Sequence, residues 1–161
     1  MPISNKINIA VVGATGYTGL DLILMLSKHP MVNIVNLCAT KNVGKNISFF
    51  DSRIKKKLPK ISLTTQINFN NIDLVFLSLP NGEAQKLIKK YYHKYVKLKF
   101  IDLSGDFRIK DTKIYFKNYK IKHSASNLIK KSFYSIPELK KKNIAKYRII
   151  SNPGCYPTSI I

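Results

Sequence analysis

The sequence predicts an α/β fold built on a doubly wound, mostly parallel sheet. A short apolar run at residues 7–12 is followed by a glycine-rich turn, a helix-like stretch and a second apolar run at residues 32–39. Strands that are apolar throughout, rather than alternating, are typical of parallel sheets covered on both faces. Together these segments make a β-turn-α-β unit of roughly 30 residues, the building block of doubly wound sheets.

The elements of this first unit follow in order along the chain. The first strand is expected over Ile7–Val12, and Gly13 ends it. The helix is expected over residues 20–28, where several apolar side chains share one face, and Pro30 lies just past its end. The second strand, over residues 32–39, closes the unit.

The remaining elements are less regular. Three further strands are expected, over residues 73–79, 99–103 and 147–151. A helix is expected over residues 83–95, and residues 40–71 and 106–145 are expected to be irregular and rich in loops. Because Pro157 suits the first turn of a helix, a last helix is expected to open at Tyr156 or Pro157.

The composition is close to globular averages, with 45% apolar and 22% charged residues in a chain of 161. No apolar stretch approaches the roughly 18 residues that cross a bilayer, so we expect no membrane partner. The first residues lack the basic region, apolar core and cleavage site of a secretory signal, which favours a cytoplasmic location. Two cysteines are too few for the disulfide framework of a secreted domain.

The net charge of +20 is the unusual feature of the composition. Such a charge would suit nucleic acid or another polyanion. However, 25 of the 28 cations are lysines, spread along the chain, and only three are the arginines that make forked contacts to bases and phosphates. We attribute the charge mainly to a compositional bias toward lysine, and expect no nucleic-acid partner.

A glycine-rich turn follows the first strand. Its sequence, Gly-Ala-Thr-Gly-Tyr-Thr-Gly at residues 13–19, has the spacing G-x-x-G-x-x-G, a variant of the dinucleotide-binding fingerprint. Glycines allow close approach of a pyrophosphate, and the helix behind them offers free N–H groups to the anion. A tight turn without a ligand is the alternative, but the flanking strand and helix favour a Rossmann-type cofactor site. The expected cofactor contacts in the turn are Gly13, Thr15, Gly16, Tyr17, Thr18 and Gly19.

The end of the second strand indicates which cofactor binds. NAD-binding units usually place an acidic residue there to bond the ribose 2′-hydroxyl. Here the segment 38–42 holds no acid, whereas Thr40 can donate a hydrogen bond and Lys41 can neutralise a 2′-phosphate. The segment therefore favours NADP(H), although Lys41 could also be one more surface lysine.

The two cysteines have different surroundings in the sequence. Cys155 follows the turn Asn152-Pro153-Gly154 at the expected start of a helix, where the positive helix end favours the nucleophilic thiolate. Cys38 lies inside an apolar strand and is expected to be a structural core residue. A hydride cofactor and a thiolate together suggest reduction of an activated acyl group through a thioester. No metal site is expected.

With this glycine turn and this cysteine motif, the sequence resembles the N-acetyl-γ-glutamyl-phosphate reductase family, the NADPH-dependent enzymes of arginine biosynthesis. Four motifs carry the resemblance, in the family's order and across almost the whole chain. They are the glycine turn 13–19, Asp-Leu-Ser-Gly-Asp-Phe-Arg at 102–108, Ile-Pro-Glu-Leu at 136–139, and Asn-Pro-Gly-Cys-Tyr-Pro-Thr at 152–158. The last of these motifs is the most specific.

The resemblance implies a reaction and roles for residues. Cys155 would attack the acyl carbon of N-acetyl-γ-glutamyl phosphate, and NADPH would reduce the thioester to N-acetyl-L-glutamate 5-semialdehyde. Arg108 and Asn152 would contact the substrate, and Pro80 the cofactor. For Arg108, a surface ion pair with Asp106 or Asp111 is the alternative.

The resemblance also implies a domain organisation, and the sequence departs from the family's pattern in two respects. Residues 1–155 would form the NADP-binding domain, and 156–161 the start of a helix leading to a second α+β domain, so we expect a fragment of a homo-oligomeric enzyme. Asn81 stands where the family often has histidine; it can still donate a hydrogen bond. The catalytic acid–base group is not in this chain, because His29, His93 and His123 match no family motif and are expected on the surface.

Two other functions remain open from the sequence. A semialdehyde dehydrogenase of similar fold, such as the aspartate enzyme, also has a cysteine after an asparagine-containing turn. A non-catalytic NADP-binding remnant is the second alternative.

Overall fold

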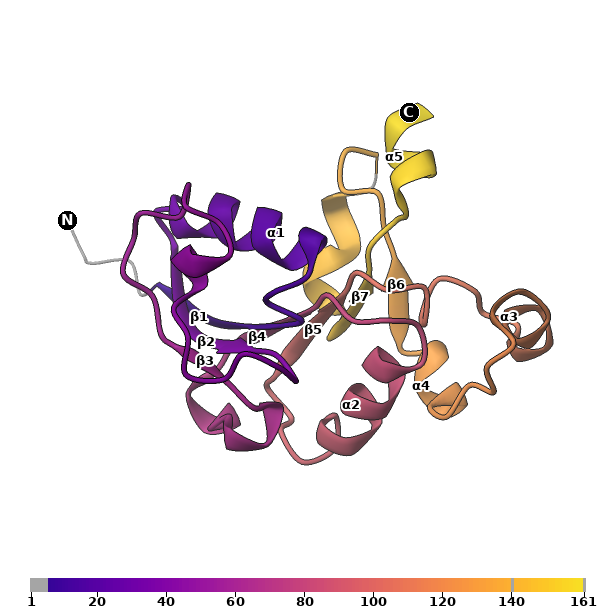
Figure 1. The fold of residues 1–161 in the computed structure, drawn as a ribbon. Helices are drawn as coiled ribbons and strands as arrows, with labels where there is room; N and C mark the ends of the chain where they lie inside the picture. The colour runs from indigo at the N-terminus through magenta and orange to yellow at the C-terminus, as the bar shows by residue number, and fades with distance from the viewer. Residues whose placement is uncertain (1–5, 140, 161) are drawn as a thin grey trace. The chain divides into compact units, whose positions relative to one another are not determined.

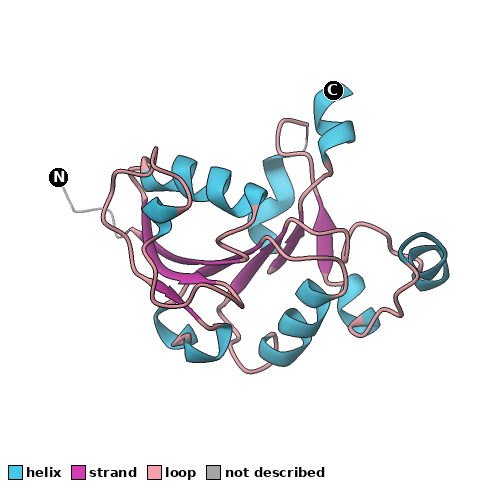
Figure 2. Cartoon of the chain, viewed as in Figure 1, coloured by secondary structure: helices cyan, strands magenta, loops and turns pink. Residues whose placement is uncertain are grey.

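The computed structural model describes residues 6–139 and 141–160 (Figure 1). The chain divides into two compact units, residues 1–78 and residues 79–161. Each unit contains parallel strands with helices or helical turns beside them, as Figure 2 shows by colour. The α/β class with parallel strand pairing, predicted from the sequence, is confirmed. The domain boundary expected at residue 155 stays a prediction.

The first unit is built around a buried central strand. Its strands are β1 (Ile7–Val12), β2 (Val32–Cys38), β3 (Ile61–Ser62) and β4 (Leu74–Leu77), in the spatial order β3-β2-β1-β4. β1 pairs in parallel with β2 on one side and β4 on the other, with Val12 opposite Cys38 and Leu77. Because β1 is covered on both faces, its last four residues are all buried, which explains why the run is apolar without alternation.

Helix α1 (Tyr17–Ser27) connects β1 to β2 and packs against both of them. Ile23 projects from it into a core shared with Ile9, Ile34 and Leu37. Three short 3-10 turns fill the long connections: η1 (Ile47–Phe49), η2 (Thr64–Gln66) and η3 (Phe69–Asn71). This arrangement brings the carboxyl ends of β1 and β2 to one edge, where the glycine turn and residues 39–41 lie.

The second unit has three parallel strands in the order β5-β7-β6. These are β5 (Lys99–Asp102), β6 (Ser132–Tyr134) and β7 (Ile149–Ser151). Its helical elements are α2 (Glu83–Tyr91), α3 (Thr112–Tyr119), α4 (Ser126–Ile129), η4 (Lys141–Lys146) and α5 (Cys155–Ile160). Asp102 ends β5 opposite Ser151 of β7, so the segments after both strands leave the same edge.

Several boundaries differ from those expected. Helix α1 begins at Tyr17, three residues before the expected start, because the turn of the glycine motif passes directly into the helix. Helix α2 ends at Tyr91 and not at Tyr95, and α5 opens at Cys155, ahead of Tyr156. The regions expected to be irregular contain β3, α3, α4 and β6. Of these, β3, α4 and β6 have only two to four residues, and elements so short carry too little periodicity to be seen in a sequence.

Within the described residues, no helix combines the length and the apolar character that a bilayer-spanning segment needs.

Candidate active site

The glycine turn is shaped by two glycines that touch backbone. Gly13 has a φ of +87°, and a Cβ at this position would overlap the carbonyl oxygen of Ser78. A Cβ at Gly19 would overlap the carbonyl oxygen of Gly13. The N–H groups of Gly13 and Ala14 both donate to the carbonyl oxygen of Cys38, at 2.9 and 3.0 Å. The first and third glycines of the motif are therefore required by the turn itself.

The middle glycine has a different environment. Gly16 is exposed and forms the N-cap of α1, where no side chain caps the helix and no acidic residue lies in the first turn. A Cβ there would meet only the Gly13 carbonyl oxygen, at an ordinary contact distance of 3.5 Å. The first-turn N–H groups of an uncapped helix attract an anion. Bare backbone at the N-terminus of an 11-residue helix fits the pyrophosphate of a dinucleotide.

The side chains of the turn lie close to solvent. Tyr17 is 93% exposed, Thr18 is exposed, and Thr15 is half-buried. The two exposed side chains are therefore free to contact a ligand over the turn. The six expected residues of this motif lie at the carboxyl end of β1: Gly13, Thr15 and Gly16 in the turn, and Tyr17, Thr18 and Gly19 in the first turn of α1.

The segment after β2 is fixed by hydrogen bonds to β3. The N–H of Ala39 donates to the carbonyl oxygen of Ser62, and the N–H of Gly44 donates to that of Ile61. Thr40 and Lys41 stand between these anchors and both are exposed. No carboxylate occurs between residues 38 and 46, so nothing there would repel a 2′-phosphate.

The two cysteines differ as expected. Cys38 is fully buried in β2, and burial raises the pKa of its thiol although Ser62 lies 3.6 Å from the sulfur. Cys155 is exposed at the first residue of α5. Both thiols are free. Only Cys155 therefore has the access that a nucleophile needs.

Arg108 lies against the loop that leads to Cys155. Its Nε donates to the carbonyl oxygen of Asn152 at 2.8 Å, and its Nη2 donates to the carbonyl oxygen of Leu103 at 2.8 Å. A Cβ built on Gly154 would stand 3.0 Å from Arg108 Nη1, which shows how closely the guanidinium approaches this loop. The expected alternative, an ion pair with Asp106 or Asp111, is wrong for the described residues, because backbone carbonyls hold the guanidinium instead.

Two buried carboxylates organise the turn that carries Arg108. Asp102 accepts hydrogen bonds from the N–H and hydroxyl of Ser104 and from the N–H of Phe107. Asp106 accepts from the N–H groups of Gly82 and Gln85 and from the Tyr115 hydroxyl. Burial is the main cause that raises the pKa of Asp102 to about 6, and burial followed by the bond to Asp106 raises the pKa of Tyr115.

The loop Pro80-Asn81-Gly82 is joined to the same turn. The Oδ1 of Asn81 accepts a hydrogen bond from the N–H of Gly105 at 2.9 Å, so this amide serves as an acceptor here. Gly82 has a φ of +92° and presents its N–H to Asp106. Pro80 precedes these contacts and is exposed.

The expectation that His123 lies on the surface is wrong. The ring is buried between Phe107 and Tyr115, with its Nε2 at 2.9 Å from the carbonyl oxygen of Asp106. Its Nδ1 accepts from the N–H of Ala125, so Nε2 carries the proton. Burial lowers the pKa of His123, which keeps the ring neutral. His29 and His93 are exposed, as expected.

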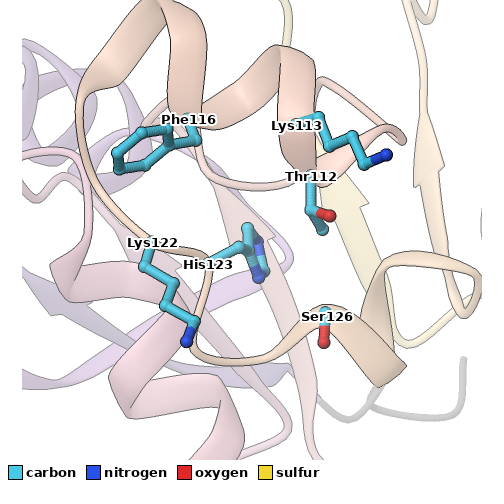
Figure 3. A pocket seen from close by; sticks show the side chains of 6 residues that line it. All are labelled: Thr112, Lys113, Phe116, Lys122, His123 and Ser126. Carbon is cyan, nitrogen blue, oxygen red and sulfur yellow. The ribbon is translucent and has the colours of Figure 1, made fainter.

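A hollow of about 450 Å³ lies beside His123 (Figure 3). Its lining comes from α3, from the segment that leads into α4 and from the first residue of α4: Thr112, Lys113, Phe116, Lys122, His123 and Ser126. Both ring nitrogens of His123 are already engaged, so the histidine offers no free polar atom to a ligand in this hollow. No group of three metal-ligating side chains occurs among residues 6–139 and 141–160.

Sequence reasoning assigned no individual role to Asp102, Asp106 and Tyr115, whose hydrogen bonds hold the turn before Arg108. One signal was present: the chain has only eight acidic residues, and two of them flank Leu103-Ser104-Gly105. Buried carboxylates in so basic a chain point to a local hydrogen-bonding role.

Comparison with known proteins defines the class. Residues 8–147 match the family described as "Semialdehyde dehydrogenase, NAD binding domain", and the chain belongs to that family. Solved structures share the fold. Aspartate semialdehyde dehydrogenase II from Vibrio cholerae superposes with a TM-score of 0.66 at 19% identity, over 97% of this chain and 44% of that one. The Candida albicans enzyme, solved with NADP, gives 0.62 at 21% identity, over 96% and 44%.

Sequence comparison identifies the relatives more closely. The chain is 43% identical over 160 residues to the N-acetyl-γ-glutamyl-phosphate reductase of Ehrlichia canis, which confirms the resemblance drawn from the motifs. That match covers 98% of this chain and 45% of the relative. The chain thus spans less than half the length of the curated relatives that it matches.

Proposed function

We propose that this chain is the cofactor-binding and thiol-bearing part of an NADPH-dependent reductase of N-acetyl-γ-glutamyl phosphate. The observation that carries the proposal is the exposed Cys155 at the start of α5, next to a loop that Arg108 contacts. The identity to named reductases supports the choice of substrate, and the motif around Cys155 favours it over aspartate semialdehyde chemistry.

The reaction begins at the Cys155 sulfur. The thiolate attacks the γ-carbonyl carbon, the bond from that carbon to the phosphate oxygen breaks, and phosphate leaves with the electron pair. Arg108 and Asn152 lie beside this position and would hold the anionic substrate, because a guanidinium is the preferred partner of phosphate and carboxylate. The product of this step is a thioester on Cys155.

All but one of the residues proposed to hold the cofactor lie at the carboxyl edge of the first unit. The N-terminus of α1 and the glycine turn would hold the pyrophosphate, with Tyr17 and Thr18 beside it. Thr40 and Lys41 would contact the 2′-phosphate, and Pro80 is proposed as a further cofactor contact. When bound, NADPH supplies the hydride that reduces the thioester, releasing the semialdehyde and restoring the thiolate. We further propose that the enzyme acts in the cytoplasm as a homo-oligomer.

The acylation step can be tested on this chain. We expect incubation with N-acetyl-γ-glutamyl phosphate to release one phosphate per chain and to leave an acyl group on the peptide containing Cys155, detected by mass spectrometry. The variant Cys155→Ser is expected to lack the thioester, while Cys38→Ser retains it. Acylation of Cys38 instead, or of neither thiol, would contradict the proposal.

A further inference from the structure

The turn after β5 is wound around one side chain. The Asp102 carboxylate accepts the Ser104 N–H at 2.9 Å, the Ser104 hydroxyl at 2.6 Å and the Phe107 N–H at 3.2 Å. The Ser104 hydroxyl oxygen in turn accepts the N–H of Asp106 at 3.2 Å. One buried carboxylate thus fixes, directly or through Ser104, three backbone N–H groups between residues 104 and 107.

Arg108 is the first residue beyond these contacts. Its guanidinium folds back onto the Leu103 carbonyl oxygen inside the turn and reaches across to the Asn152 carbonyl oxygen. The backbone of Asp102 also contacts that loop, because the Asn152 N–H donates to the Asp102 carbonyl oxygen at 2.8 Å. The same residue therefore shapes the turn that carries Arg108 and holds the loop that Arg108 approaches.

The orientation of the guanidinium leaves one of its nitrogens facing the loop 152–154, which leads to Cys155. Nε and Nη2 donate to the two carbonyl oxygens. Nη1 is the guanidinium nitrogen that lies nearest to Gly154, 3.0 Å from where a Cβ on that residue would stand. An arginine held in this way presents a fixed positive charge immediately before Cys155. A long side chain without such anchors would lose this orientation to rotamer entropy.

We infer that Asp102, acting through Ser104, is a positioning residue that directs the Arg108 guanidinium toward anionic reagents at Cys155. This inference rests on the proposed function only in taking Arg108 as the contact for the substrate anion. Asp102 itself touches neither the substrate nor the sulfur; it acts through the geometry of the turn.

The test compares two alkylating reagents on the intact chain. Iodoacetate is an anion and iodoacetamide is neutral, so the ratio of their rates at Cys155 reports the positive charge near the sulfur. The rates are measured at pH 8 by mass spectrometry of the peptide containing Cys155. The variants are Arg108→Ala, Asp102→Asn and Ser104→Ala. Asp111→Asn is the matched control, because it removes a carboxylate that caps α3 at Lys113 and Ile114.

The positioning role and simple electrostatics predict opposite changes of the rate ratio for Asp102→Asn. Arg108→Ala is expected to lower the ratio of the iodoacetate rate to the iodoacetamide rate roughly threefold, because it removes one positive charge close to the sulfur. Asp102→Asn and Ser104→Ala are expected to lower it similarly. Asp102→Asn removes a negative charge, which by itself would raise the ratio; Asp111→Asn is expected to leave it unchanged or slightly raised.

Two results would overturn the inference in distinguishable ways. If Arg108→Ala lowers the ratio but Asp102→Asn and Ser104→Ala do not, Asp102 has no positioning role and the anion contact of the proposed function stands. If Arg108→Ala leaves the ratio unchanged, the anion contact itself fails. Thermal melts identify folded variants, and Ser104→Ala, which keeps the carboxylate, decides the question if Asp102→Asn does not fold.

Discussion

Cys155 and Cys38 differ in the properties that govern thiol reactivity. Cys155 is exposed, whereas Cys38 is fully buried and burial raises its pKa. We expect iodoacetamide at neutral pH to modify Cys155 about tenfold faster or more, because the thiolate is the reacting species and must be reached by the reagent. Peptide mass spectrometry after timed quenching measures both rates. Preferential labelling of Cys38 would reverse the assignment of the nucleophile.

Asp102 makes stability depend on pH. Its folded-state pKa is raised to about 6, chiefly by burial, so the folded state binds the proton more tightly than the unfolded state. The associated stability is present below about pH 4 and is lost as the pH rises through about 6. The buried His123, whose pKa is lowered, acts in the opposite direction, so the wild type alone does not isolate the effect.

Comparison of the wild type with Asp102→Asn isolates the contribution of the Asp102 carboxyl to the pH dependence of stability. The free energy of unfolding of the wild type, minus that of the variant, is expected to fall by roughly 2 kcal/mol between pH 4 and pH 7. Urea unfolding at several pH values measures this difference. A difference that stays constant with pH would show that the carboxylate does not titrate in this range.

The glycine turn joins β1 to α1 and demands glycine at its first position. Gly13 and Gly44 have nearly the same φ, +87° and +84°, but a Cβ would overlap Ser78 at the former and meets nothing within 4 Å at the latter. We expect Gly13→Ala to cost more than about 3 kcal/mol of stability and Gly44→Ala about 1 kcal/mol. Denaturant titration of both variants provides the comparison. Equal costs would mean that the contact with Ser78 is not what constrains the turn.

The segment after β2 is expected to select the phosphorylated cofactor. Lys41→Glu removes an attractive charge and adds a repulsive one, so the preference for NADP(H) over NAD(H) should shrink by about 1–3 kcal/mol. Calorimetric titration with both cofactors measures the preference. Lys89→Glu, at an exposed position of α2, is the control for net charge. Equal loss in both variants would point to a general charge effect.

The elements that could be predicted from the sequence are those with long apolar runs or with a motif. The strands β1, β2 and β4 and helix α1 were found because burial on both faces leaves a readable pattern. The two-residue strand β3 and the four-residue helix α4 are too short for that. Asp106 and His123 were missed for a related reason: their hydrogen bonds reach residues 24 and 17 positions away in the chain, which spacing does not reveal.

At the scale of the whole molecule, the chain supplies two of the parts that reductive thioester chemistry needs: a candidate cofactor loop in one unit and a candidate thiol in the other. The described histidines either lie buried and engaged or on the surface, and none stands in a family motif. General acid–base catalysis contributes roughly 10²–10⁴ in rate. We therefore expect the 161-residue chain alone to show no measurable turnover.

The most direct test joins this chain to the part that its relatives possess in addition. A chimera would carry residues 1–161, followed by the remaining part of the Ehrlichia canis reductase, which is 43% identical over the shared region. NADPH oxidation is then followed with N-acetyl-γ-glutamyl phosphate, with the intact Ehrlichia canis enzyme as reference. We expect turnover by the chimera, none by the 161-residue chain alone, and none by the Cys155→Ser chimera. Turnover that survives Cys155→Ser, or a folded chimera that binds NADPH but never turns over, would contradict the account.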